Sequence, residues 1–188
     1  SLSGGLAFEG LNNAAKLNSN LIILVNDNQM SIDENQGGLY KGLKELRDTN
    51  GESPNNIFKF MGLDYKYVVD GNDLQSMIET FKEIKDIDHP IVLHVNTLKG
   101  KGYEPAVEEK MKYHWRTPFD LKTGEDKVKV SGESYSDAVL AELDKQIAAD
   151  KPVVAINAGI PGAFDLGKFK AKHSDRYYDV GIAEQDSI

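Results

Sequence analysis

Three polar residues near the start of the chain form the first candidate site. Asn26, Asp27 and Asn28 end or directly follow the mostly apolar run 21–26. The side-chain carbonyl of Asn28 is a neutral oxygen donor, which Mg²⁺ accepts alongside carboxylate, backbone carbonyl and phosphate oxygens. The same residue types commonly end a strand and begin a loop, so an Asx turn is the alternative interpretation.

A second candidate site is a basic, glycine-rich segment that contains Lys99 and Lys101 and follows the apolar run 91–95. A lysine in a loop at that place can pair with a phosphate or a carboxylate. A solvated basic turn is the alternative. The segment lacks the GxxxxGK[ST] spacing, so it does not support binding of a nucleoside triphosphate.

Two other residues have side chains suited to proton transfer. An imidazole is a common proton-transfer group, and we expect Trp115, the only tryptophan of the chain, to shelter that of His114. Glu184 follows a short predicted strand, where a lone acid is commonly a solvated cap. A buried carboxyl with a raised pKa would instead suit acid–base work.

The elements that position these residues predict an α/β fold. The run 21–26 indicates a strand buried on both faces of a parallel sheet. Residues 74–84 have the spacing of an amphipathic helix, and residues 91–95 indicate a second buried strand. Strands that alternate with helices predict βαβ units, in which ligands bind beyond the carboxyl ends of the strands.

The other elements of this fold are less strongly marked. They are expected at residues 6–17, 39–46, 57–61, 65–69, 134–147, 153–157 and 177–180. Ser1 and Ser3 are the predicted N-caps of the first helix. Met77 and Phe81 are predicted core residues, and His94 is predicted to be a core imidazole whose hydrogen bonds are satisfied.

A charged, turn-rich segment divides the chain into two predicted domains. Residues 1–116 form a nearly complete first domain, residues 117–133 a linker, and residues 134–188 the start of a second domain. The second domain is predicted to be incomplete, because two strands and one helix cannot cover both faces of a sheet.

The composition restricts the classes of function. A formal net charge of -8 argues against nucleic acid and anionic membranes as partners. The absence of cysteine excludes disulfides, thiolate catalysis and Cys-ligated metals. The apolar runs have the length of strands and no signal peptide is visible, so we expect a cytoplasmic protein.

Five segments together resemble the 1-deoxy-D-xylulose-5-phosphate synthase family: SLSGGLAFEGLNNA, NDNQMSI, GLDYKYVVDGND, DIDHPIVLHVNTLKGKGYEPA and RYYDVGIAEQ. The likeness covers nearly the whole chain. Residues 1–30 also look like the second part of the thiamine-diphosphate motif, which transketolases share. Because the chain begins without methionine inside this motif and stops four residues after Glu184, we expect it to be a fragment.

The resemblance implies a parallel-sheet thiamine-diphosphate-binding fold, with a diphosphate-binding domain followed by the start of a pyrimidine-binding domain. It implies a transferase that condenses pyruvate with D-glyceraldehyde 3-phosphate, giving 1-deoxy-D-xylulose 5-phosphate and CO₂ for isoprenoid, thiamine and pyridoxal synthesis. The implied cofactors are thiamine diphosphate and Mg²⁺, and the implied assembly is a homodimer. The chain by itself is expected to be inactive.

The resemblance also assigns roles to individual residues. Glu184 would contact the pyrimidine ring and, with His114, carry the catalysis. Asn28 and the carbonyl of Met30 would bind Mg²⁺. The full set of implied cofactor-binding residues is Ser1, Asn28, Met30, Ile32, Lys99, Ile182 and Glu184. Asp186 stands where many members of the family have histidine, so no role is carried over to that position.

Two alternatives remain at this stage. One is a different transketolase-type enzyme, although such an enzyme is not expected to combine DIDHP with KGKGYEPA. The other is a non-catalytic binding or regulatory module.

Overall fold

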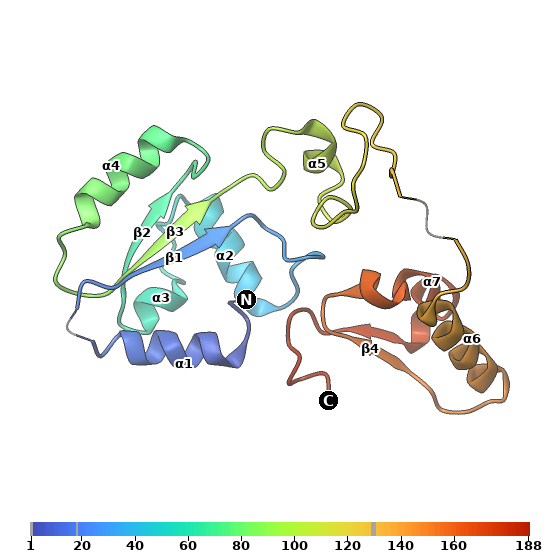
Figure 1. Cartoon of the computed structure of the whole chain (residues 1–188). Helices are drawn as coiled ribbons and strands as arrows, with labels where there is room; N and C mark the ends of the chain where they lie inside the picture. Colours follow the sequence, from blue (N-terminus) through green and yellow to red (C-terminus); the bar gives the residue numbers. More distant parts are fainter. Residues whose placement is uncertain (1, 18, 129–130) are drawn as a thin grey trace. The chain divides into compact units, whose positions relative to one another are not determined.

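The computed structural model describes residues 2–17, 19–128 and 131–188. Two compact units are present (Figure 1). The first unit consists of the described residues of 1–30 and 35–110, and the second of residues 31–34 and the described residues of 111–188. The predicted linker, residues 117–133, therefore falls within the second unit, and its residues 129 and 130 lie outside the described part.

The first unit is built around a three-stranded parallel sheet, as the α/β prediction requires. Its strands are β1 (Ile22–Asp27), β2 (Asp64–Val68) and β3 (Ile91–Asn96), in the order β1-β3-β2. Its helices are α1 (Gly5–Ala14), α2 (Gly38–Asp48), α3 (Ile57–Phe60), α4 (Leu74–Ile84) and α5 (Glu104–Glu108). Since Ile22 and Asp64 both pair with Ile91, the three carboxyl ends lie at one edge.

Helices cover both faces of this sheet, so its central strand is buried from Ile91 to Val95. Residues of α1, α2 and α3 pack with Val25 and Val92 on one face. On the other face, α4 packs against β2 and β3, and its Ile84 joins Leu93 and Val95 (Figure 1). Val92 and Leu93 are fully buried and point to opposite faces, which explains why β3 reads as a continuous apolar run.

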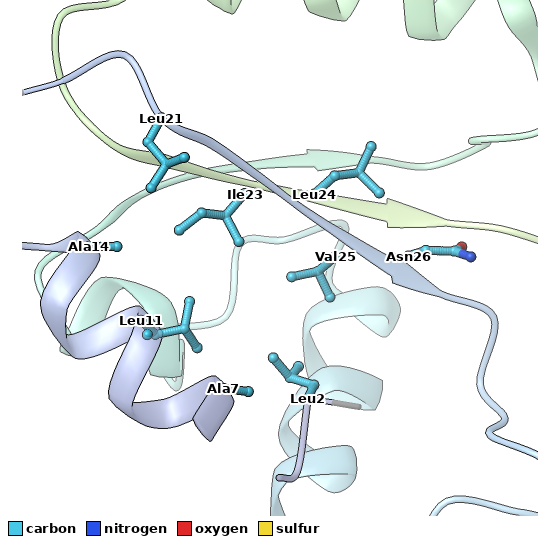
Figure 2. Close-up of a pocket in the computed structure, with 10 residues that line it drawn as sticks. Leu2, Ala7, Leu11, Ala14, Leu21, Ile23, Leu24, Val25 and Asn26 are labelled. Carbon is cyan, nitrogen blue, oxygen red and sulfur yellow. The ribbon is translucent and has the colours of Figure 1, made fainter. Parts of the chain in front are cut away.

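The prediction that the first strand is buried on both faces is wrong, because β1 lies at the edge of the sheet. Figure 2 shows Ile23 and Val25 turned toward α1, whereas Leu24 points the other way. Leu24 is 48% exposed. A cavity of about 490 Å³, lined mostly by apolar side chains including Leu2, Leu11 and Val25, lies between α1 and β1.

Two local predictions about helices are also wrong. Gly4, not a serine, is the N-cap of α1 and makes no side-chain cap. Ser3 instead shares a hydrogen bond with Tyr40, while Ser1 lies outside the described residues. Phe81 is 37% exposed on α4, although Met77, one turn earlier, packs on the core as predicted. The spacing of the apolar residues locates the helix but not the width of its buried face.

The second unit contains one long helix and a two-stranded parallel sheet. Its elements are α6 (Tyr135–Ala148), β4 (Ala155–Asn157), η1 (Pro161–Phe164), α7 (Leu166–Lys172), η2 (Ser174–Arg176) and β5 (Tyr177–Asp179). Ser134 caps α6 in a reciprocal capping box with Asp137. Ala155 pairs with Tyr177, so Asn157 and Asp179 face each other where the two strands end.

Residues of the predicted linker have defined contacts in this unit. Phe119 and Asp126 form an antiparallel bridge, and the guanidinium of Arg116 donates to the carboxylate of Asp126 at 2.6 Å. In the part of the chain that the structure describes, no helix is long and apolar enough to cross a membrane.

Candidate functional site

The turn after β1 holds Asn28 at the carboxyl edge of the first sheet. The backbone N–H of Met30 donates to Oδ1 of Asn28 at 3.1 Å, so the Asx turn considered from the sequence is present. Gln29, between them, has the left-handed backbone angle φ 68. A carbonyl oxygen has two lone pairs, and this hydrogen bond uses one. The turn therefore leaves Asn28 able to coordinate a cation.

Asp27, which precedes this turn, is buried and receives three hydrogen bonds. Oδ2 accepts from the Arg47 guanidinium at 2.5 Å and from Nε2 of His94 at 2.9 Å. Oδ1 accepts the backbone N–H of Gln29 at 3.1 Å. Burial alone would raise the pKa of Asp27, but the hydrogen bonds from His94 and Arg47 and the charge of Arg47 lower it on balance.

His94 extends this network into the core and is the satisfied core imidazole that the sequence predicts. It is fully buried, and its Nδ1 lies 2.7 Å from the hydroxyl of Tyr65. A carboxylate only accepts, so Nε2 carries the hydrogen toward Asp27, and in the neutral ring Nδ1 accepts from Tyr65. Burial raises the pKa of Tyr65, which keeps its hydroxyl protonated as a donor.

The loop that carries Lys99 leaves the same edge of the sheet. Its start is fixed by the N–H of Leu98, which donates to the Asn72 side chain at 2.7 Å. Gly100 has φ 88, and a Cβ there would lie 2.4 Å from the carbonyl oxygen of Ala106, so the loop packs closely on α5. Burial, and secondarily the positive charge of Lys110, lower the pKa of Lys99. A bound anion would offset both effects.

In the second unit, Asp179 anchors the turn that leads to Ile182 and Glu184. Its Oδ1 accepts the N–H of Gly181 at 2.8 Å, and its Oδ2 accepts from Asn157 at 2.5 Å and from Tyr177 at 3.0 Å. Burial alone would raise the pKa of Asp179, but these hydrogen bonds lower it on balance.

Glu184 itself lies exposed in this turn, and its backbone carbonyl accepts from the Ser187 hydroxyl at 2.7 Å. Ile182 is half-buried, and its Cδ1 lies so close to Gly159 that a Cβ on that glycine would approach it to 2.8 Å. The second unit thus fixes the backbone before Glu184 and leaves the residue itself exposed.

His114 and Ile32 line one cavity of about 720 Å³ within the second unit. The remaining lining residues are Met111, Lys112, Trp115, Ile160, Pro161, Gly162, Ala163, Asp165 and Gly167. Trp115 is 77% exposed and His114 is exposed as well, so the expectation that the indole shelters the imidazole is wrong. The cavity nevertheless combines an apolar wall with an imidazole, an ammonium and a carboxylate.

The predicted site residues thus fall into two groups. Asn28, Met30 and Lys99 belong to the first unit, and the second unit holds Ile32, His114, Ile182 and Glu184. Ser1 lies outside the described residues. Sequence reasoning missed the anchoring roles of Asp27 and Asp179, although each is the last residue of a strand, a position where a short acceptor side chain can hold the following turn.

The donors of the first unit suit part of a magnesium shell. Among the described residues, no group of three or more histidine and acidic side chains is placed to hold a metal ion. The oxygens that the turn offers are neutral, namely the Asn28 amide and the Met30 carbonyl. Magnesium usually takes few protein ligands and completes its octahedron with water and substrate phosphates. The turn therefore fits as a contributor to a metal site and not as a complete cage.

The fold and these residues define a class of protein. Parallel α/β units bind ligands at the carboxyl ends of their strands, and here that edge presents amide oxygens and a lysine suited to an anion. The model of the family described as 1-deoxy-D-xylulose-5-phosphate synthase matches residues 1–53 and 45–97. The chain belongs to the 1-deoxy-D-xylulose-5-phosphate synthase family.

Curated relatives agree with this assignment over the whole chain. The 1-deoxy-D-xylulose-5-phosphate synthase of Lachnoclostridium phytofermentans is 36% identical over 224 residues, which cover 100% of this chain and 36% of that protein. Synthase 1 of Geobacter metallireducens is 36% identical and the Gloeobacter violaceus enzyme 35%, each with the same two coverages. The chain thus spans about a third of the length of the relatives it matches.

The comparison also shows that this chain is shorter than the part of the relative that it matches. This chain contributes 188 residues to an alignment of 224 positions, so the Lachnoclostridium protein has at least 36 residues there without a counterpart. The two spans matched by the family model overlap at residues 45–53, where α2 leads toward α3. Here Glu45 accepts from the side chains of Ser53 at 2.5 Å and Asn55 at 3.0 Å, so α2 is tied to the segment that precedes α3.

Proposed function

We propose that this chain supplies part of the cofactor site of a 1-deoxy-D-xylulose-5-phosphate synthase. The reaction joins pyruvate and D-glyceraldehyde 3-phosphate and releases CO₂ as 1-deoxy-D-xylulose 5-phosphate forms. The observation that carries the proposal is the polar turn after β1, which holds Asn28 at the ligand-binding edge of a parallel sheet. Membership of the family supplies the identity of the reaction.

In this proposal the first unit binds the diphosphate end of thiamine diphosphate through Mg²⁺. Asn28 Oδ1 and the Met30 carbonyl contribute two of the metal's oxygen ligands. Lys99 approaches a phosphate oxygen, whose negative charge would offset the burial and the charge of Lys110 that lower the pKa of this lysine. Water and phosphate oxygens would complete the coordination shell of Mg²⁺ that these two protein ligands begin.

The second unit binds the pyrimidine end, with Ile182 against the ring and Glu184 at a ring nitrogen. Thiamine diphosphate, when bound, would supply a carbon acid for addition to a carbonyl group. Glu184 holds a proton at its carboxyl and donates it in a hydrogen bond to the ring nitrogen. His114 moves a proton on bound substrate, in a cavity that already has an apolar wall and charged groups beside it.

Three further features belong to the same proposal. The working enzyme is a homodimer in the cytoplasm. Glu184 is exposed here, and in the working enzyme it is buried by residues outside these 188. Because the chain spans only 36% of its relatives' length, we expect the 188 residues alone to form no product from pyruvate and glyceraldehyde phosphate.

The proposal is tested with Asn28→Leu in the protein encoded by the complete reading frame. Calorimetric titration with thiamine diphosphate at several Mg²⁺ concentrations measures the affinity for both ligands together. We expect both affinities to fall with the fold intact, because leucine offers no oxygen to the metal. Asn12→Leu, at an exposed position of α1, is the matched control. Unchanged affinity in Asn28→Leu, with Mg²⁺ still required, would reduce Asn28 to a turn residue.

A further inference from the structure

The carboxylate of Asp27 connects the turn that holds Asn28 to two other elements of the first unit. Arg47 reaches it from α2 and His94 from β3. The backbone carbonyl of Asp27 also accepts the N–H of Thr97 at 3.0 Å. Both the side chain and the backbone at the base of the turn are therefore fixed.

From this base, two consecutive Asx turns determine the conformation of the segment. Asp27 Oδ1 accepts from Gln29 N–H at 3.1 Å, and Asn28 Oδ1 accepts from Met30 N–H at 3.1 Å. Gln29 has φ 68, which a residue with a Cβ adopts rarely and which the surrounding hydrogen bonds must hold. If the Asp27 carboxylate turned away, the N–H of Gln29 would lose its acceptor and the orientation of Asn28 would be free to change.

Stability alone does not explain this arrangement. The side chains of Asp27 and Arg47 are only 3% and 14% exposed, so the cost of removing both charges from water offsets much of their attraction. Apolar side chains of similar volume would hold α2 against β1 at no such cost. An apolar side chain cannot accept the N–H of Gln29, and it cannot receive hydrogen bonds from Arg47 and His94 that hold it in place.

We propose that Asp27 is a positioning residue for the metal-binding turn, and that Arg47 and His94 act through it by holding its carboxylate in place. This inference rests on the proposed role of Asn28 as a magnesium ligand. Residues that orient metal ligands in this way typically change metal affinity by about 10-fold to 100-fold when they are replaced.

The test removes one support of Asp27 and leaves the turn sequence untouched. Arg47→Met deletes the guanidinium, and Arg47→Lys keeps the charge without the planar group, which gives a milder variant in case the first folds poorly. Lys44→Met is the matched control, because Lys44 lies on the same helix with its side chain 66% exposed and paired with Asp48.

Amide hydrogen exchange in this 188-residue chain measures directly how often the hydrogen bonds of the turn open. For Arg47→Met we expect exchange at Gln29 and Met30 to rise about tenfold more than exchange at the amides of β3, a selective change that a general loss of stability does not produce. Arg47→Lys should give an intermediate rise and Lys44→Met none. Equal rises at the turn and in β3 would overturn the positioning role.

Metal affinity tests the functional half of the inference. In the protein encoded by the complete reading frame, Arg47→Met should weaken Mg²⁺ binding in the presence of thiamine diphosphate by about tenfold or more. The same change in an Asn28→Leu background should add little, since both act on one ligand. Normal affinity in Arg47→Met alone would overturn the positioning role. Normal affinity in Asn28→Leu as well would locate the failure in the proposed metal site.

Discussion

Removing one hydroxyl group from the buried network should destabilise the first unit by a measurable amount. In Tyr65→Phe the ring remains, so its stacking on Phe58 at 5.8 Å and its edge contact with His94 at 5.9 Å are kept. The hydrogen bond of 2.7 Å to Nδ1 of His94 is lost. His94 is fully buried, so the acceptor is left without water to replace the hydroxyl.

A buried acceptor without its donor costs about 1–3 kcal/mol. Since 1.4 kcal/mol corresponds to a factor of ten, the equilibrium constant for opening of the first unit should rise by about 5-fold to 150-fold. Hydrogen exchange at the amides of Leu93 and Val95, in the central strand, measures this opening by NMR. Fluorescence of Trp115 would not, because that residue belongs to the second unit.

Tyr178→Phe, in the second unit, is the control for the loss of an exposed hydroxyl elsewhere in the chain. Tyr178 is 54% exposed, and its hydroxyl reaches the Asp175 carbonyl only at 3.5 Å, so its loss should change stability by less than about 0.5 kcal/mol. If protection of β3 fell no more in Tyr65→Phe than in Tyr178→Phe, the reasoning would be refuted, because His94 would then need no donor at Nδ1.

Three further predictions concern the second unit. Glu184→Gln keeps the size of the side chain but cannot protonate a ring nitrogen. In the protein encoded by the complete reading frame, cofactor binding should therefore persist while exchange of the cofactor's C2 proton slows at least about a hundredfold. An exchange rate equal to that of the wild type, measured by quenched-flow NMR, would remove Glu184 from the mechanism. His114→Asn should slow turnover and spare cofactor affinity, and equal losses of both would make the segment structural. The pKa of Asp179 is lowered in the folded unit, so its contribution to stability is complete above the unfolded value of about 3.9 and is lost as the pH falls through the folded value. Urea midpoints measured between neutral and acid pH should therefore fall more steeply for the wild type than for Asp179→Asn.

Much of the fold was predictable because each helix or strand shows its apolar periodicity within its own short segment. The helix expected at residues 74–84 matches α4, and the buried strand at 91–95 matches β3 to within one residue. The edge position of β1 was not predictable. A run such as 21–26 records how apolar a strand is, whereas its exposure depends on which strands and helices lie beside it.

The candidate site residues could be selected from the sequence, but the contacts that hold them in place could not. Asn28 and Lys99 can be selected as candidates because each follows an apolar segment that indicates a strand. Arg47 looks like one of several charged residues on the solvated face of an amphipathic helix, yet its guanidinium turns inward to Asp27. Partners separated by 20 residues or more leave no local pattern in a single sequence, so such a network is visible only when the chain is folded.

The sequence separations within the network have a consequence for the order of folding. Tyr65 and His94 are 29 residues apart, whereas His94 and Asp27 are 67 apart. Closing the longer loop costs about 0.7 kcal/mol more chain entropy, so we expect β2, α4 and β3 to associate before β1 docks at the edge. The hydrogen bond from His94 to Asp27 would then be among the last contacts of the first unit to form and among the first to be lost on unfolding. A chain that is mostly folded would already have the core around β3 while the edge that carries Asn28 is still incomplete.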